Sequence, residues 1–178
     1  RIDPDVYSDD RGAFMETYRT ERYERAGINA VFVQDNVSRS QEGVLRGLHL
    51  QNPQAQAKLV YVLAGTVYDV VVDVRRGSDT FGAWMGTMLN AWSGQLYVPE
   101  GFAHGFAVTE GPAVFAYKCT EVYAPSAEVS IRWNDPDLAI DWPVDSPIVS
   151  EKDAAAPRLR DIDTERLTFE TPAASPQP

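Results

Sequence analysis

Histidine is the side chain best suited to moving protons near neutral pH, and this sequence contains two, His49 and His104. His104 lies in the segment Phe-Ala-His-Gly-Phe, where strand alternation places its ring on the same face as Phe102 and Phe106. That face would be an apolar interior. The simplest interpretation of His104 is therefore a hydrogen-bonded core histidine.

His49 ends the segment Arg-Gly-Leu-His, three positions after Arg46. In a regular strand this spacing puts the two side chains on opposite faces of the sheet. A bulge at Gly47 would bring them to one face. Without the bulge, His49 is an ordinary edge or surface histidine.

Other kinds of site have little support in the sequence. Zinc or iron bound through imidazole usually takes two or three histidines and a carboxylate, and the chain has no His-x-His pair. Cys119 has no nucleophile signature around it, and no Gly-rich phosphate loop is present. We expect no metal, which leaves acid-base chemistry by His, Lys, Tyr and Asp, or no chemistry at all.

The composition excludes several classes of partner. Among 178 residues, 26 are acidic and 16 basic, and the formal net charge is -10, so binding to nucleic acid or to an anionic membrane is not expected. A few converging cations could still bind a small anion. We found neither a run of about 20 apolar residues nor a signal-peptide pattern, and we expect a cytoplasmic protein.

The elements that would position these residues are mainly strands. Apolar residues recur with a period of two in short runs bounded by Gly and Pro, which predicts an all-β sandwich, jelly roll or barrel with a few short peripheral helices. The length favours a single domain over 1–178, with a flexible tail at 171–178. The expected strands are 58–64, 66–74, 81–89, 95–98, 102–109 and 113–121, and the expected helices are 20–26 and 153–159.

Strand parity in 66–74 places two carboxylates on one face. Asp69 and Asp73 share that face with Val67 and Val71. A polar barrel interior that holds a ligand would explain the pattern. The solvated face of a sandwich would explain it equally well.

Several segments of the chain occur in the order found in one family. Taken together they resemble dTDP-4-dehydrorhamnose 3,5-epimerase, over almost the whole chain from Arg11 to Leu159. The motifs are Phe-Val-Gln-Asp-Asn-Val-Ser-Arg-Ser at 32–40, Gly-Val-Leu-Arg-Gly-Leu-His at 43–49, Lys-Leu-Val at 58–60, Val-Asp-Val-Arg at 72–75, Pro-Glu-Gly-Phe-Ala-His-Gly-Phe at 99–106, Tyr-Lys at 117–118, Ile-Arg-Trp-Asn-Asp-Pro at 131–136 and Ser-Glu-Lys-Asp-Ala-Ala-Ala-Pro at 150–157.

The resemblance implies a cupin-like jelly roll that forms a homodimer and works without metal or organic cofactor. The implied substrate is dTDP-4-dehydro-6-deoxy-D-glucose, inverted at C3 and C5. The implied base is His49, paired with Asp153, while Tyr117 acts as the acid from the opposite side of the sugar and Lys58 stabilises the enolate. The implied substrate-binding positions are Arg11, Phe14, Glu16, Gln34, Asn36, Arg46, Asp73, His104, Tyr123, Glu128 and Lys152.

The sequence departs from the family pattern in two places. The spacing from His49 to Lys58 is one residue shorter than usual, with Ala57 where glycine often precedes the lysine. Val122 precedes Tyr123 where many members carry an aromatic residue. A single-centre epimerase or ketoisomerase of a related sugar nucleotide is the closest alternative. A non-catalytic sugar-nucleotide sensor and a metal-dependent cupin are the alternatives of other classes.

Overall fold

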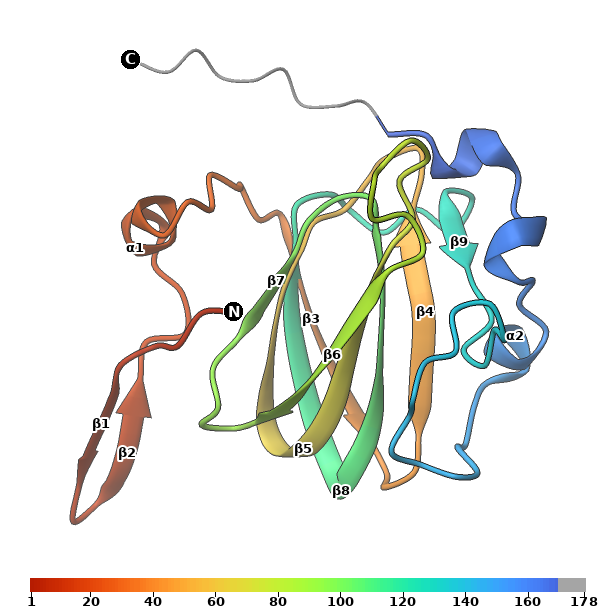
Figure 1. Ribbon diagram of the computed structural model, residues 1–178. Helices are drawn as coiled ribbons and strands as arrows, with labels where there is room; N and C mark the ends of the chain where they lie inside the picture. Colours follow the sequence, from red (N-terminus) through yellow and green to blue (C-terminus); the bar gives the residue numbers. More distant parts are fainter. Residues whose placement is uncertain (170–178) are drawn as a thin grey trace, which may run out of the picture.

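The alternating segments form strands that build one large sheet and a small hairpin, as Figure 1 shows for the computed structural model. The structure describes residues 1–169. Its strands are β1 (Val6–Asp9), β2 (Gly12–Met15), β3 (Gln34–Ser40), β4 (Leu45–Gln51), β5 (Lys58–Asp73), β6 (Trp84–Asn90), β7 (Leu96–Val98), β8 (Phe102–Cys119) and β9 (Glu128–Ser130). The helices are α1 (Thr20–Arg25) and α2 (Glu151–Ala154), with 3-10 turns η1 (Leu159–Asp161) and η2 (Thr164–Leu167).

The antiparallel pair β5 and β8 is the centre of the large sheet. Its register runs from Lys58 opposite Cys119 to Asp73 opposite Phe102. Strands β7 and β3 flank one end of this pair, whereas β6 and β4 flank the other end and β9 adds to β4. The predicted all-β class with a few short peripheral helices is confirmed, because the described residues form one large antiparallel sheet, a small hairpin and only short helices.

Two predicted turns lie within strands. We expected strand ends at Gly65 and at residues 110–112, but β5 and β8 stay paired across both, with register shifts between Val62 and Val67. Gly65 has a φ of +75°, and a Cβ there would lie 2.6 Å from the Glu110 carbonyl oxygen. Glycine therefore allows the two strands to bend together without separating.

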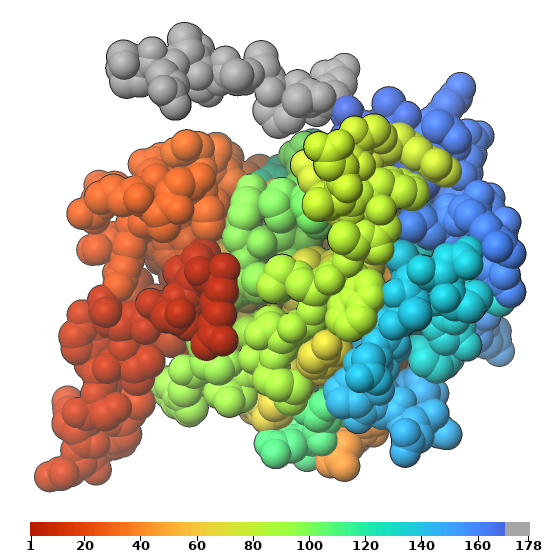
Figure 2. All heavy atoms as spheres, viewed as in Figure 1, coloured from red at the N-terminus to blue at the C-terminus, as the bar shows by residue number. Residues whose placement is uncertain are grey.

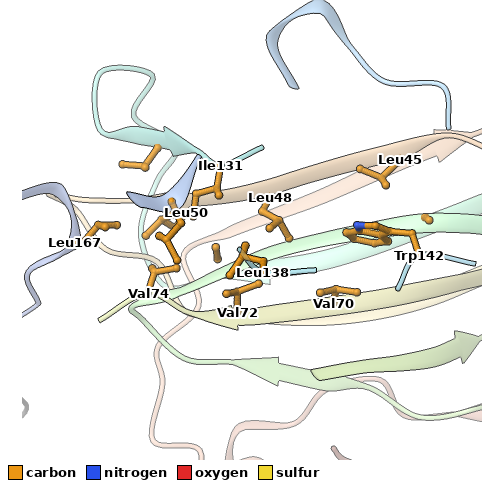
Figure 3. Close-up of a cluster of buried hydrophobic side chains, with 14 residues drawn as sticks. Leu45, Leu48, Leu50, Val70, Val72, Val74, Ile131, Leu138, Trp142 and Leu167 are labelled. Carbon is orange, nitrogen blue, oxygen red and sulfur yellow. The ribbon is translucent and has the colours of Figure 1, made fainter. Parts of the chain in front are cut away.

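Both faces of β5 are buried, so the solvated-face interpretation of its aspartates is wrong. Asp69 is 1% exposed and Asp73 2% exposed. Val67 and Val71 pack in the barrel interior, whereas the opposite face contributes to a second core under the C-terminal segment. Figure 3 shows that second core, whose labelled members are Leu45, Leu48, Leu50, Val70, Val72, Val74, Ile131, Leu138, Trp142 and Leu167.

The peripheral elements follow the prediction in part. Helix α1 matches 20–26, but the predicted helix 153–159 is wrong in its bounds, because α2 begins at Glu151 and ends before Pro157. The Ser150 hydroxyl accepts a hydrogen bond from the Asp153 N–H and so fixes where α2 starts. In the part of the chain that the structure describes, no helix is long and apolar enough to span a membrane.

The hairpin of β1 and β2 projects from the barrel, as Figures 1 and 2 show. All four residues of β1 are exposed, and in β2 only Met15 is partly covered. The predicted tail at 171–178 lies outside the described residues, and the single domain over 1–178 stays a prediction.

Candidate active site

The barrel contains a cavity of about 710 Å³ that adjoins a smaller one of about 260 Å³. The two cavities share five lining residues that come from β4, β5, β8, β9 and the loop before β9. These residues are His49, Lys58, Tyr117, Tyr123 and Glu128. The structure therefore brings the predicted base, acid and cation to one space.

His49 and Asp153 form a hydrogen-bonded pair at the wall of the larger cavity. The distance from His49 Nε2 to Asp153 Oδ1 is 2.6 Å. The His49 side chain is 25% exposed, whereas that of Asp153 is 4% exposed. Among the described residues Nδ1 of His49 has no hydrogen-bond partner, so one ring nitrogen is oriented by a carboxylate and the other is free to exchange a proton.

Asp153 is held as a carboxylate. Burial would raise its pKa, but the hydrogen bond from His49, the charge of that ring and the Gly47 N–H outweigh burial, so the pKa lies below its ordinary value. An ionised Asp153 can stabilise the imidazolium that forms when His49 takes a proton.

The predicted bulge in β4 is confirmed. The pairing of β4 with β8 shifts register between Arg46 and His49, and both side chains reach the larger cavity. Gly47 has a φ of +121°, and a Cβ there would lie 2.6 Å from the Cα of Gly105. Glycine is needed at position 47 for two reasons: the positive φ and the close approach of the β8 backbone.

Tyr117 and Lys58 reach the cavity from the two central strands. Burial raises the pKa of Tyr117, which keeps its phenol protonated and able to donate. Burial lowers the pKa of Lys58, while the nearby Cys119 and Glu128 oppose that shift. Burial thus weakens the preference of Lys58 for its charged form, and an anionic oxygen bound beside it would favour the ammonium in the low local dielectric.

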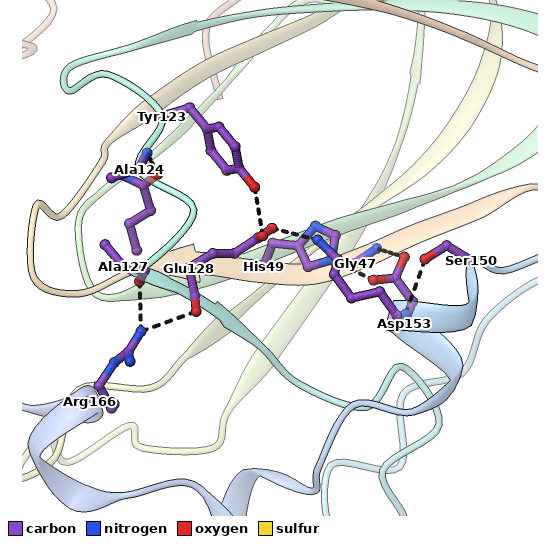
Figure 4. A network of polar contacts seen from close by, with 11 residues as sticks. Gly47, His49, Tyr123, Ala124, Ala127, Glu128, Ser150, Asp153 and Arg166 are labelled. Atoms are coloured by element: carbon purple, nitrogen blue, oxygen red, sulfur yellow. Dashed lines mark hydrogen bonds and ion pairs between the residues drawn. The ribbon is translucent and has the colours of Figure 1, made fainter.

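Glu128 contacts two other predicted substrate-binding residues, Tyr123 and Lys152, and Figure 4 shows its contact with Tyr123. Its carboxylate accepts hydrogen bonds from Tyr123 Oη at 2.9 Å and from Lys152 Nζ at 2.8 Å. Burial would raise the pKa of Glu128, but these two bonds and the charge of His49 lower it. The wall is thus an ordered network that ends beside the His49 ring.

Strand β3 also lines the cavities. Its alternation points Gln34, Asn36 and Ser38 to the cavities, and Gln34 accepts a hydrogen bond from the Tyr123 backbone N–H at 2.8 Å. Arg46 donates from Nε to Ser40 Oγ at 3.0 Å, which orients its guanidinium along the larger cavity.

The carboxylate that faces His104 is Asp69, and the prediction of Asp73 as a site residue is wrong. His104 Nε2 lies 2.9 Å from Asp69 Oδ2, with both side chains buried. Asp73 accepts hydrogen bonds from Arg75, Ser78 and Thr80 in the turn after β5 and lines neither cavity. Strand parity places both aspartates on the same face of β5. This parity was the one sequence feature that pointed to Asp69 as a residue of the interior.

Arg11, Phe14 and Glu16 lie outside the cavities of their own chain. Arg11 is at the tip of the projecting hairpin, where it pairs with Asp9, and its side chain is 90% exposed. Phe14 is 68% exposed. The structure does not bring these three residues together with the other predicted site residues.

Comparison with known proteins shows which family this chain belongs to. The family model described as dTDP-4-dehydrorhamnose 3,5-epimerase matches residues 1–161. A protein of that name from Pseudomonas aeruginosa is 52% identical over 165 residues, which cover 91% of each chain. The chain belongs to the dTDP-4-dehydrorhamnose 3,5-epimerase family.

Solved structures of epimerases share the fold closely. The dTDP-6-deoxy-D-glucose-3,5-epimerase of Legionella pneumophila, in complex with dTDP-4-keto-L-rhamnose, superposes with a TM-score of 0.92 at 53% identity, covering 95% of this chain and 92% of that one. A 3'-monoepimerase of Streptomyces bikiniensis, in complex with dTDP-quinovose, is 39% identical with a TM-score of 0.83, covering 88% and 81%. The resemblance on which the family prediction rested is confirmed.

The two departures from the epimerase pattern lie beside predicted site residues, Lys58 and Tyr123. Ala57 is buried and its N–H donates to Thr120 Oγ1 at 2.9 Å, which keeps the start of β5 in place before Lys58. Val122 is 49% exposed and adds no ring to the wall formed by Tyr123. Within residues 1–169, no group of three His, Cys, Asp or Glu side chains is arranged to hold a metal ion.

Proposed function

We propose that this chain inverts C3 and C5 of dTDP-4-dehydro-6-deoxy-D-glucose, with His49 as base, Tyr117 as acid and Lys58 at the enolate oxygen. The observation that carries the proposal is the convergence of these three groups on one cavity, with the base oriented by Asp153. Inverting a carbon next to a ketone requires one group to remove its proton, one to stabilise the enolate oxygen and one to return a proton to the other face.

In the proposed step, His49 takes the proton from the carbon beside the C4 ketone. The electrons of the broken C–H bond move to the C4 oxygen, where Lys58 balances the negative charge. Tyr117 then returns a proton to the opposite face of the carbon, and the enolate electrons form the new C–H bond. Solvent then takes the extra proton from His49 and returns a proton to Tyr117, so the reaction needs no oxidant or reductant.

Incubation of the protein with dTDP-4-dehydro-6-deoxyglucose in deuterated water tests this function. We expect NMR to show deuterium at both C3 and C5 and the appearance of the epimerised product. Deuterium at one carbon would identify a single-centre epimerase, like the 3'-monoepimerase of Streptomyces bikiniensis. Deuterium at neither carbon would overturn the proposal.

We also infer that two copies form a homodimer in which the β1–β2 hairpin of one copy borders the nucleotide site of the other. The hairpin exposes Tyr7 and Phe14, which are 62% and 68% accessible, and its Arg11 has no role in its own cavity. An arginine on a projecting arm is suited to a partner's diphosphate.

Complementation between two inactive variants tests the shared site. The first variant, His49→Ala, lacks the proposed base. The second variant combines Arg11→Ala with Phe14→Ala and lacks the two hairpin side chains proposed to reach the partner's site. If the sites are shared, unfolding and refolding the two variants together should give mixed dimers, half of whose sites are intact. Recovery of activity is expected, and a monomeric mass in light scattering would contradict the inference.

A further inference from the structure

Strand β9, which carries Glu128, has a strand neighbour on one side only in the described part of the chain. Leu48 and Ile131 exchange both backbone hydrogen bonds where β4 meets the residue after β9. Because bonded and non-bonded pairs alternate along antiparallel strands, Glu128 falls in a non-bonded pair and its carbonyl points away from β4.

Arg166 occupies the open side of β9, as Figure 4 shows. Its Nη2 donates to the carbonyl of Glu128 at 3.1 Å and to that of Ala127 at 2.9 Å. The guanidinium contacts the backbone of Glu128 and leaves the carboxylate to Tyr123 and Lys152. It therefore acts on the position of this side chain.

The segment around Arg166 is fixed on both sides of the guanidinium. Leu167 is fully buried in the core under the C-terminal segment. Asn52, just after β4, donates from Nδ2 to the carbonyls of Arg166 at 3.2 Å and Thr168 at 2.8 Å. The backbone around the arginine is thus bonded to the residue that directly follows β4, the strand that carries His49.

This attachment lies beyond the part of the chain that the family model matches, which ends at residue 161. We propose that Arg166 is a positioning residue of the substrate-binding wall, holding β9 so that Glu128 meets Tyr123 and Lys152. The inference rests on the proposed function for the identity of the substrate, but nucleotide binding tests it independently of turnover.

The test compares Arg166→Met, which keeps an apolar stem and removes the donors, with Arg166→Lys, whose ammonium can still donate to two carbonyls. We expect Arg166→Met to raise the KM for the sugar nucleotide and the Kd for dTDP about ten-fold, with kcat changed less than about three-fold. In the Arg166→Lys variant, KM and Kd should both stay within about three-fold of the values for the unaltered protein.

Two controls separate positioning from stability. Arg160→Ala removes an arginine of the same C-terminal segment that pairs with Asp137 and Asp161, and it should leave KM unchanged. A purely structural role for Arg166 would lower Tm and the active fraction without changing KM or Kd, and that result would overturn the proposal.

A double variant tests whether Arg166 affects dTDP binding only through Glu128. If Arg166 acts through Glu128, Arg166→Met should raise the dTDP Kd no further in a Glu128→Ala background. Additive effects would contradict the proposal. If the protein turns over no substrate but binds dTDP, the proposed function fails while these binding comparisons still decide the role of Arg166. Absence of dTDP binding by the unaltered protein would overturn both.

Discussion

The two histidine–aspartate pairs of this protein have the same chemistry in different surroundings. His49 is 25% exposed and its aspartate comes from α2, outside the barrel strands. His104 is 8% exposed, its aspartate comes from β5, and its ring stacks on Phe115 with 5.9 Å between the ring centroids and 26° between the ring planes. Both rings line the larger cavity and both use Nε2 for their aspartate, so the difference lies in exposure. The more accessible His49 is better suited to proton transfer, whereas the enclosed His104 is suited to holding the shape of the interior.

The largest expected difference between the pairs is in turnover. His49→Ala should lower kcat by about 10³-fold or more, because it removes the proposed base. His104→Ala should lower kcat about ten-fold, through loss of a lining residue. Steady-state kinetics with calorimetry of dTDP binding measures both variants. An equal or larger loss in His104→Ala would reverse the roles assigned to the two pairs.

A smaller difference is expected when each carboxylate becomes an amide. Asp153→Asn keeps the size of the side chain but removes the charge that stabilises the imidazolium, so kcat should fall about 10²-fold. Asp69→Asn should change kcat less than about five-fold, since His104 transfers no proton in the proposed step. A comparable loss of kcat in the two variants would show that both pairs take part in the chemistry.

For the free energy of unfolding, the loss of Asp69 should cost more than the loss of Asp153. Asp69→Ala leaves the enclosed His104 without a partner and should lower the free energy of unfolding by about 1–3 kcal/mol. Asp153→Ala should cost about 1 kcal/mol or less, because His49 can bond to water from the cavity. Urea denaturation measures both, and a larger cost for Asp153→Ala would contradict the structural role of the buried pair.

The smallest expected effect is on the pH dependence of stability. The pKa of Asp153 is lowered in the folded state, so its contribution to stability is complete above the unfolded pKa of about 4 and is lost as pH falls below it. Asp153→Asn should therefore flatten the loss of stability between about pH 5 and pH 3. Denaturation curves at several pH values measure this, and an unchanged slope would mean that Asp153 titrates normally.

The sequence named both members of the first pair, through the family resemblance, but only the histidine of the second. Alternation correctly placed His104 in the interior, and Gly47 marked the bulge that lets Arg46 and His49 share a cavity. The partner of His104 was missed because parity gives Asp69 and Asp73 the same face. Only their distance along β5 separates them, since Asp73 lies at the strand end and is captured by the following turn.

The N-terminal residues show a second limit of sequence reasoning. The resemblance placed Arg11, Phe14 and Glu16 at the substrate, yet within one chain they lie on or next to the projecting hairpin. A motif records which residues act together, but it does not say whether they belong to one copy. The extent of β5 and β8 was missed for a similar local reason, because glycine and proline mark a bend and a strand end alike.

The long pairing of β5 with β8 also orders the steps by which the site is assembled during folding. Asp73 and Phe102 are the closest in sequence of its partners, and Lys58 and Cys119 the most distant. Closing the shorter loop costs less chain entropy, so the pair should zip from the Asp73 end toward Lys58 and Tyr117. The lysine and tyrosine of the active site would then be among the last groups to reach their places.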